Sequence, residues 1–375
     1  MSERGPGPFF GENMAKRAKN IWPQVVDFNN LLEAFRMVRK GKRDRTSVAK
    51  LYFNLDDRLF DLRDSLTSHS WHPGKWREFV VNEVKPRFIQ APAAEDRIVH
   101  WALMLQAAWF FERRFIYDSY ACRVGKGAHR ASKRTTQYLR EATRLWGNPY
   151  VIKGDISKYF PSIDQAILME TITDIIADRD VLWLFDLIIR AEQYQTAANV
   201  ITPAYGAGIC IGALTSQWLA NLYFDPIDHF IKETLGVKFY LRYMDDFVVI
   251  GPTKAWCHMA LDTIEKRVNL RKLRLNPKTD IYPASHGVDF VGYRHWTDHI
   301  LPRKRTVKRA RHLFAEIQRL YEMGEVDISY ITPRVASFTG YMQHCDGYQT
   351  LDKILDRFVL VRGGGAEGEW GIKQK

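Results

Sequence analysis

Two adjacent carboxylates, Asp245 and Asp246, stand between apolar, β-prone residues in the segment Phe239–Ile250. Asp is uncommon inside strands, so the pattern predicts a hairpin with both carboxylates at its tip, beside a buried sheet. Earlier in the chain, the apolar run Tyr150–Ile152 leads to a third carboxylate, Asp155. If the fold brings these side chains together, they are suited to hold two divalent cations about 3.5–4 Å apart.

Oxygen ligands with open coordination positions favour Mg²⁺, which keeps several waters and takes its remaining ligands from substrate phosphates. The alternative interpretation of the Asp pair is a polar hairpin turn, because Asp is a common turn residue. A single Asp at a strand end is also unremarkable. The chemical interpretation therefore requires that the fold join the two segments.

The elements that must position these carboxylates alternate between strand-like and helical patterns. Strands separated by helices, with few tight hairpins, favour an α+β or mixed α/β core over a β-sandwich. A strand pair is expected within Trp71–Ala91, further strands at Tyr150–Ile156, Val237–Tyr243, Phe247–Ile250 and Val288–Tyr293, and helices at Arg97–Phe115, Gln165–Ala177, Val181–Arg190, Ser216–Glu233 and Ala255–Val268.

The composition is that of a globular protein with excess positive charge. Of the 375 residues, 46% are hydrophobic and 26% charged, and the 55 Lys and Arg exceed the 43 Asp and Glu to give a net charge of +12. These values exclude the disordered, collagenous and coiled-coil classes and predict roughly two to three domain-sized units. The charge points to a polyanionic partner, nucleic acid before membrane, with an ordinary basic enzyme as the alternative.

Neither a membrane anchor nor a disulfide framework is expected. The longest apolar run, Ala102–Phe111, is interrupted by Gln106 and is about half of a membrane span. The four cysteines form no CxxC pair, which argues against zinc ribbons and disulfide scaffolds. We expect buried thiols in a reduced compartment, and therefore a cytosolic protein.

Several blocks of the sequence resemble reverse transcriptases. Tyr243–Asp246 together with Asp155–Phe160 is similar to the catalytic palm of that family. Other blocks follow in the family's order over roughly residues 30 to 295, which chance explains poorly. Lys85–Ile89 and Glu95–His100 resemble the first fingers motif, Ser119–His129 the second, and Leu275–Thr279 and Gly287–Tyr293 the last palm motifs and the primer grip.

The resemblance implies an α+β right-hand polymerase, with fingers, a palm built on a ferredoxin-like antiparallel sheet, and a helical thumb. Its activity would be RNA-directed DNA polymerisation with two Mg²⁺ ions, Mn²⁺ being an alternative metal. Asp155 and Asp245 would bind both ions, Asp246 would support one, and the backbone carbonyl of Ile156 would complete a ligand shell. Lys278 would protonate the leaving pyrophosphate, unless it is an ordinary loop lysine.

The same resemblance assigns the residues that bind the incoming deoxynucleoside triphosphate. Arg123 and Lys126 lead the cations expected to clamp its phosphates, followed by Arg97 and Lys85; without the family, these are surface charges. Phe160 would stand under the sugar and exclude a 2′-hydroxyl. The alternative for Phe160 is a core phenylalanine.

One departure from the family pattern narrows the subfamily. The chain reads Ile211-Gly212 and Ser216-Gln217 where most reverse transcriptases carry Gln-Gly and Ser-Pro. This form is similar to the reverse transcriptases of diversity-generating retroelements, and we place Ile211, Gly212 and Gln217 at the nucleotide site. The resemblance implies copying of a template RNA with errors at its adenines (mutagenic retrohoming), a small basic oligomeric accessory protein, and a bacterial, archaeal or phage source. Because Ile211 lacks the polar contacts of a Gln, we predict low fidelity.

We expect a flexible arm over residues 1–27, N-terminal helices and fingers over 28–148, a palm over 149–298 with an insertion at 178–206, a thumb over 299–362, and a disordered tail over 363–375. Alternatives are a group II intron-like or retron-like reverse transcriptase and, less favoured, a non-catalytic RNA-binding scaffold on the same fold. The thumb opens with basic residues expected to grip an RNA/DNA hybrid: Arg303, Lys304, Arg305, Lys308, Arg309 and Arg311.

Overall fold

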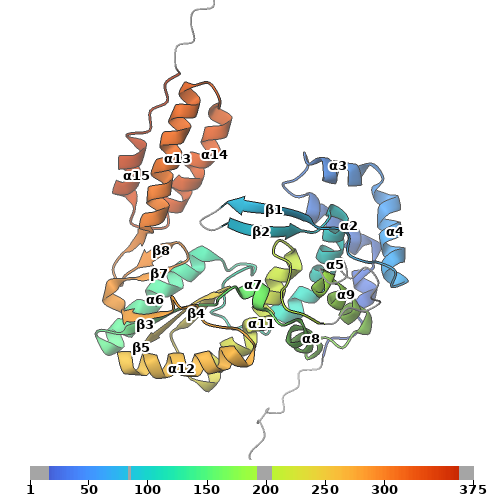
Figure 1. Ribbon diagram of the computed structural model, residues 1–375, viewed down its shortest axis with the longest axis horizontal. Helices are drawn as coiled ribbons and strands as arrows, with labels where there is room; N and C mark the ends of the chain where they lie inside the picture. Colours follow the sequence, from blue (N-terminus) through green and yellow to red (C-terminus); the bar gives the residue numbers. More distant parts are fainter. Residues whose placement is uncertain (1–16, 83–85, 192–204, 363–375) are drawn as a thin grey trace, which may run out of the picture. The chain divides into compact units, whose positions relative to one another are not determined.

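The computed structural model describes residues 17–82, 86–191 and 205–362, and the α+β class is confirmed (Figure 1). The chain divides into two compact units that interleave along the sequence. The first unit comprises Met1–Tyr117, Ile156–Phe230 and Glu265–Arg274, and the second comprises Asp118–Asp155, Ile231–Ile264 and Leu275–Lys375. The predicted boundaries of fingers, palm and thumb remain predictions, and the predicted tail lies outside the described residues.

The first unit is mainly helical and is built around one long helix, α5 (Ala94–Glu112), which packs against α2 and α11. One face of α2 is apolar, and its N-terminus is capped by Asp27, whose carboxylate accepts from the backbone N–H groups of Asn29 and Asn30. The other elements are α1 (Trp22–Val25), α2 (Phe28–Arg39), α3 (Thr46–Phe53), α4 (Leu55–Thr67), the hairpin β1 (Arg77–Asn82) and β2 (Pro86–Ala91), α7 (Tyr159–Ser162), α8 (Gln165–Thr173), α9 (Arg179–Ile189) and α11 (Leu214–His229).

Residues 17–27 are not a flexible arm, so this part of the expected arm is wrong. The helix α1 buries Trp22 and Val25. The carboxylate of Asp178 accepts from the backbone N–H groups of Ile21 at 2.7 Å and Trp22 at 3.0 Å. These contacts attach the segment to the start of α9, because apolar burial and two hydrogen bonds outweigh the polar composition that suggested an arm.

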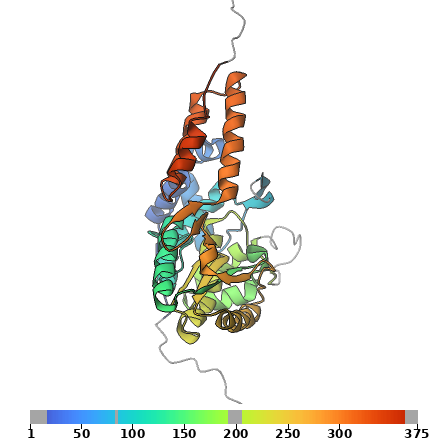
Figure 2. The same ribbon diagram turned by 90° about the vertical axis from the view of Figure 1, so that its left-hand side faces the viewer.

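The second unit contains a four-stranded antiparallel sheet in the order β4–β5–β3–β6, a three-stranded sheet β7–β8–β9, and a bundle of three helices that run side by side in both views (Figures 1 and 2). The helices α6 and α12 lie on opposite faces of the larger sheet (Figure 1). Its elements are α6 (Ala128–Trp146), β3 (Tyr150–Asp155), β4 (Tyr240–Tyr243), β5 (Asp246–Gly251), β6 (Asp280–Pro283), β7 (Val288–Phe290), β8 (Tyr293–His295), β9 (Ile300–Pro302), α13 (Lys304–Glu322), α14 (Ile328–Met342) and α15 (Tyr348–Leu355); a π-helix (Phe230–Thr234) and α12 (Lys254–Leu270) run across the division between the units.

One predicted strand is divided in the structure. The run Val288–Tyr293 was expected to be a single strand, but Val291 (φ +43°) and Gly292 (φ +95°) form a turn between β7 and β8. Glycine adopts a positive φ without steric cost, and this permits the chain to reverse inside an apolar run. The other predicted helices and strands are present with shifted ends. Within the described residues, no helix combines the length and apolar character needed to cross a membrane.

The two faces of the larger sheet have different partners. Val151, Leu241 and Val248 belong to one buried cluster with Leu139 of α6. On the opposite face, the ring of Phe247 covers Gly154, its partner in the β3–β5 ladder. A Cβ atom on Gly154 would lie 2.1 Å from Cζ of Phe247, so only glycine fits under this ring.

We therefore predict that Gly154→Ala lowers the free energy of unfolding by about 1–3 kcal/mol, because the added methyl overpacks the ladder. Urea unfolding monitored by circular dichroism measures the change. The double variant Gly154→Ala/Phe247→Leu should regain part of the loss, since leucine leaves space for the methyl group. Equal destabilisation in the single and double variants would contradict this explanation.

Candidate active site

The sheet brings the three predicted carboxylates to one end of the second unit. Asp155, the last residue of β3, stands opposite Asp246, the first residue of β5, and Tyr243 pairs with Asp246 across the β4–β5 hairpin. The turn therefore consists of Met244 and Asp245. The sequence predicted this hairpin with both Asp245 and Asp246 at its tip, whereas Asp246 is already the first residue of β5. Met244 has φ +59°, which tight hairpins require but which is unfavourable for a residue other than glycine.

A lysine that the sequence analysis did not identify lies among these carboxylates. Lys153 precedes Asp155 by two positions on β3, so both side chains lie on one face of the sheet. Its ammonium forms an ion pair with Asp246 and stands 4.9 Å from the ring centroid of Phe290. The sequence could have indicated Lys153. Side chains alternate between the two faces of a strand, so the residue two positions before a functional residue lies on the same face.

The electrostatics of Lys153 reflect this position. Burial lowers the pKa of its ammonium to about 7, although the carboxylate of Asp289 and, after it, those of Asp155 and Asp245 act in the opposite direction. An ammonium that is largely removed from water, yet surrounded by carboxylates, serves as their internal counter-ion. The region is therefore one in which negative charge gathers and a cation compensates for it.

Asn276 is a second residue that the sequence analysis did not assign. Its side-chain Nδ2 donates to Oδ2 of Asp155 at 2.8 Å, and its backbone N–H donates to the Asp155 carbonyl at 2.7 Å. Lys278, predicted to be catalytic, is exposed, and its backbone N–H donates to Oδ1 of Asn276 at 3.0 Å. In this structure the motif Leu275–Thr279 therefore orients Asp155 through Asn276.

The carboxylates have the oxygen donors that Mg²⁺ prefers. Over the described ranges, however, no three His, Cys, Asp or Glu side chains are gathered into a ready metal cluster, and the Lys153 ammonium pairs with Asp246. The carboxylate oxygens of Asp155, Asp245 and Asp246 therefore suit a hard divalent cation once the Lys153 ammonium no longer pairs with Asp246.

The loop that carries Arg123 and Lys126 belongs to the same unit. Nη1 of Arg123 donates to the Ser119 carbonyl at 2.8 Å, and Nζ of Lys126 stands 5.2 Å from the ring centroid of Tyr120. Gly125 (φ +71°) and Gly127 (φ +95°) allow the chain to turn tightly before α6. Both cations are half-buried and closely tied to the segment that precedes them.

The remaining predicted nucleotide-site residues belong to the first unit. Arg97 is half-buried and its Nε donates to the Pro92 carbonyl at 2.9 Å, while Phe160 packs edge-on against Tyr159. The Ile211 carbonyl accepts from the backbone N–H of Gln90 at 3.0 Å. Ile156 is buried, Gly212 (φ +129°) and Gln217 are exposed, and Lys85 lies outside the described residues.

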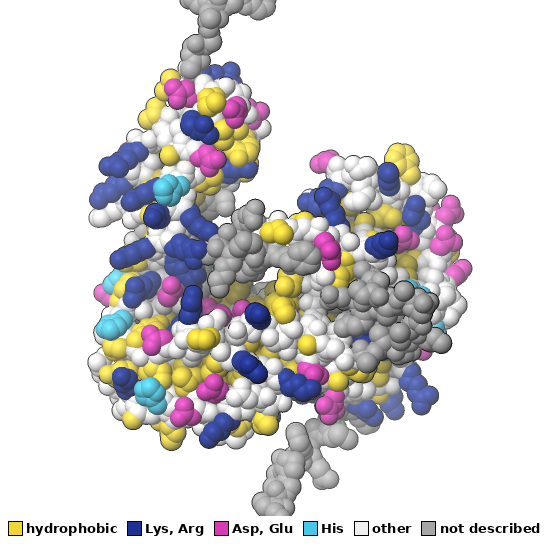
Figure 3. All heavy atoms as spheres, viewed as in Figure 1, with side chains coloured by type: hydrophobic (Ala, Val, Ile, Leu, Met, Phe, Trp, Pro, Cys, Tyr) yellow, Lys and Arg dark blue, Asp and Glu magenta, His cyan; other side chains and the backbone are white. Residues whose placement is uncertain are grey.

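The predicted nucleic-acid residues at the start of α13 are mostly exposed. Figure 3 shows Lys and Arg side chains gathered over the base of the helical bundle and the small sheet next to it. Arg303 is half-buried and paired with Asp289, and Arg294 lies in the same basic region. The exposed members are Lys304, Arg305, Lys308, Arg309 and Arg311.

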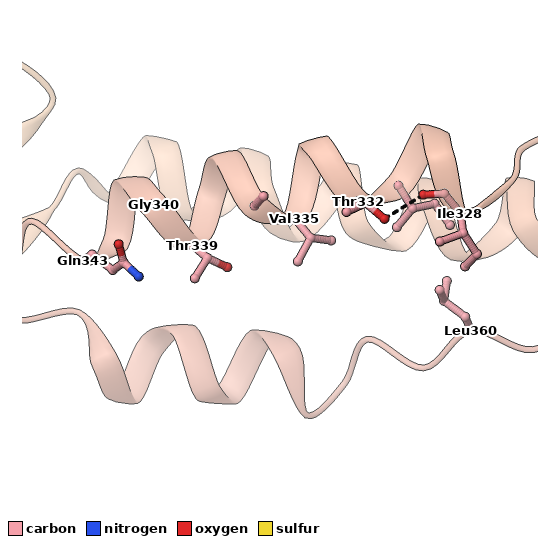
Figure 4. Close-up of a pocket in the computed structure, with 9 residues that line it drawn as sticks. Ile328, Thr332, Val335, Thr339, Gly340, Gln343 and Leu360 are labelled. Atoms are coloured by element: carbon pink, nitrogen blue, oxygen red, sulfur yellow. Dashed lines mark hydrogen bonds between the residues drawn. The ribbon is translucent and has the colours of Figure 1, made fainter.

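A cavity of about 550 Å³ along α14 offers no comparable chemistry (Figure 4). Ile331, Val335 and Leu360 provide much of its apolar lining, and none of its lining residues carries a titratable side chain. The carboxylate end of the larger sheet is therefore the candidate active site.

Comparison with known proteins agrees with this choice. Residues 81–295 match the family described as reverse transcriptase (RNA-dependent DNA polymerase). Protein YkfC of Escherichia coli K12 is 27% identical over 289 residues, which cover 67% of this chain and 74% of that protein. Nuclear intron maturase 1, mitochondrial, of Arabidopsis thaliana is 27% identical over 128 residues, which cover 34% of this chain and 16% of the maturase.

Solved structures of telomerase are also similar. Apo telomerase from Candida tropicalis has a TM-score of 0.48 at 11% identity over 75% of this chain and 59% of that chain. Telomerase from Candida albicans, in complex with a fragment of telomeric RNA, has a TM-score of 0.45 at 12% identity over 76% and 55%. The chain thus spans less than two thirds of these telomerase chains. Because the family match covers more than half of the chain and includes β3, β5 and the aspartate hairpin, the protein belongs to the reverse transcriptase family and is an RNA-directed DNA polymerase.

Proposed function

We propose that the protein copies a template RNA into cDNA with low fidelity at template adenines, as the reverse transcriptase of a diversity-generating retroelement. The observation that carries the catalytic part is the register that sets Asp155 opposite Asp246, with Asp245 in the adjoining turn. The subfamily rests on Ile211-Gly212 and Ser216-Gln217. A group II intron-like role is the second candidate, which the similarity to an intron maturase favours.

In this proposal Asp155 and Asp245 would hold both metal ions, and Asp246 would support one of them. Bound Mg²⁺ would supply charge stabilisation for the attacking and leaving oxygens of nucleotidyl transfer. Asn276 fixes the orientation of Asp155 through its 2.8 Å hydrogen bond. Such support matters because carboxylates that share a small site repel each other and would otherwise turn apart.

The cations of the same unit take the phosphates. Arg123 and Lys126 clamp the triphosphate of the deoxynucleotide, since planar guanidinium and ammonium groups both bind phosphate oxygens. Lys278 acts as the general acid toward pyrophosphate. The basic start of α13 binds the RNA/DNA hybrid, and a binding mode that relies on phosphates makes affinity fall as salt rises.

The wider assignments belong to the same proposal. The larger sheet and its helices form the palm, the bundle α13–α15 forms the thumb, and the N-terminal helices with the β1–β2 hairpin form the fingers. Phe160 excludes ribonucleotides. The partners are template RNA, deoxynucleoside triphosphates and a small basic oligomeric accessory protein, and the compartment is the cytoplasm.

Replacing one carboxylate tests the catalytic assignment. Asp245→Asn should lower the rate of Mg²⁺-dependent primer extension on RNA by at least about a hundredfold, because the charge that holds the metal is lost. Filter binding should show RNA affinity within about twofold of the unaltered protein, since the phosphate contacts remain. Asp298→Asn is the matched control, as Asp298 is an exposed carboxylate of the same unit. Primer extension by Asp245→Asn at the control rate would refute the assignment.

Removing the internal counter-ion tests the metal site without an activity measurement. In Lys153→Met, Mn²⁺ should bind about tenfold more tightly, or about 1.4 kcal/mol, because the ammonium no longer repels the metal or occupies Asp246. Isothermal titration calorimetry measures the affinity. Lys238→Met removes an exposed lysine of the same unit and should change nothing. Weaker Mn²⁺ binding in Lys153→Met would show that Lys153 does not compete with the metal.

Sequencing of the cDNA tests the subfamily. Ile211→Gln should reduce errors opposite template adenines by about threefold to tenfold, because a polar group near the nascent pair restores discrimination that shape supplies poorly. Leu270→Gln makes the same kind of change at an exposed position and serves as the control. Errors spread evenly over all template bases in the unaltered protein would favour the intron-like candidate.

A further inference from the structure

The strand that leads into the carboxylate turn carries a fully buried arginine. Arg242 has no exposed surface. It pairs with Phe247 across the hairpin, whereas Tyr243 pairs with Asp246, so its side chain lies on the face of the sheet opposite to Asp246. A guanidinium stays charged at all physiological pH values, and its burial is unfavourable unless its donors are well bonded.

The Arg242 guanidinium connects two separate segments of the second unit. Nη1 donates to the carbonyl oxygen of Met244 at 2.8 Å, and Nη2 donates to Oγ of Ser119, which is also fully buried, at 3.2 Å. The backbones are joined as well, because the Arg242 N–H donates to the Asp118 carbonyl at 2.9 Å and the Arg242 carbonyl accepts from the Tyr120 N–H at 3.0 Å. The segment 118–120 is thereby attached to β4 through main chain and side chain.

One end of this connection holds the turn that carries Asp245. Met244 has a positive φ, which a residue with a Cβ atom adopts only when its surroundings enforce it. The carbonyl bound by Arg242 belongs to the peptide between Met244 and Asp245. The hydrogen bond therefore acts on the peptide that sets where the Asp245 carboxylate points.

The other end holds the loop with the two half-buried cations. The Ser119 carbonyl accepts from Arg123 at 2.8 Å, and the Tyr120 carbonyl accepts from the backbone N–H of Gly127 at 2.9 Å. The neighbouring Asp118 carboxylate is bonded to Oη of Tyr138 on α6 at 2.6 Å. The base of the loop is thus attached on both sides to the segment that Arg242 contacts.

We propose that Arg242, acting with Ser119, is a positioning residue that keeps the Asp245 turn and the loop of Arg123 and Lys126 at a fixed separation. This inference rests on the proposed function, in which the turn holds the metal and the loop holds the triphosphate. The substrate that depends on the separation is the incoming deoxynucleoside triphosphate, because its phosphates must reach both groups at once.

The test is steady-state incorporation of a single deoxynucleotide on a primed RNA template with Mg²⁺, together with thermal unfolding. Ser119→Ala removes one partner of Arg242 and should raise the KM for the deoxynucleotide about threefold to tenfold, with kcat within about twofold. Arg242→Lys should raise KM further, because one ammonium cannot bridge the two acceptors as a planar fork does. A purely structural role would reduce the fraction of folded enzyme, and hence kcat, while KM stayed constant.

Ser132→Ala provides the matched control, since Ser132 is a buried serine of the same unit on α6. Its KM should equal that of the unaltered protein. If the unaltered protein extends primers and Ser119→Ala shows an unchanged KM, the positioning role is overturned while the proposed function stands. If the unaltered protein extends no primer with Mg²⁺, the proposed function itself is overturned.

Discussion

The pairing of β3 with β5 is the constraint on which the rest of the site depends. Side chains alternate across a strand, so a shift of one residue would move Asp155 to the opposite face from Asp246. The ring of Phe247 lies directly over Gly154 and resists such a shift. Every other residue of β3 has a Cβ atom, which would clash with the ring at this point. Burial of Val151 and Val248 against α6 fixes the same register from the other face.

The same register that forms the site also brings like charges together and strains the backbone. It brings half-buried carboxylates together at one end of a sheet, where they repel one another, and it requires a turn with Met244 in the left-handed region. Lys153 compensates for the negative charge, and the hydrogen bond from Arg242 stabilises the strained turn. The two side chains lie on opposite faces of the sheet: Lys153 on the face toward α6, and Arg242 on the face away from it. The carboxylates at this end of the sheet are therefore supported by basic residues on both of its faces.

Much of the fold could be predicted from local pattern. The hairpin at Tyr243–Asp246 and the strand that ends at Asp155 follow from short apolar runs interrupted by Asp, and the structure confirms both. One prediction failed because it overlooked contacts between distant segments, and another because it overlooked a turn inside an apolar run. Residues 17–27 look like an arm until Asp178 and the core around Trp22 are in place, and the run Val288–Tyr293 looks continuous until the φ values of Val291 and Gly292 are known.

By itself, the sequence determined the class of the protein and the residue types available for chemistry, because strand period, turn residues and family motifs are local properties of the chain. Only the tertiary structure decided which residues support the carboxylates. Lys153, Asn276 and Arg242 act through the register of β3 and β5, through the approach of the Leu275–Thr279 loop, and through a bridge to Ser119. The strand period places Lys153 on the same face as Asp155, but the bonds from Asn276 to Asp155 and from Arg242 to Ser119 join residues far apart along the chain. No spacing in the sequence encodes these bonds, and they exist only once the sheet and its neighbouring loops have packed.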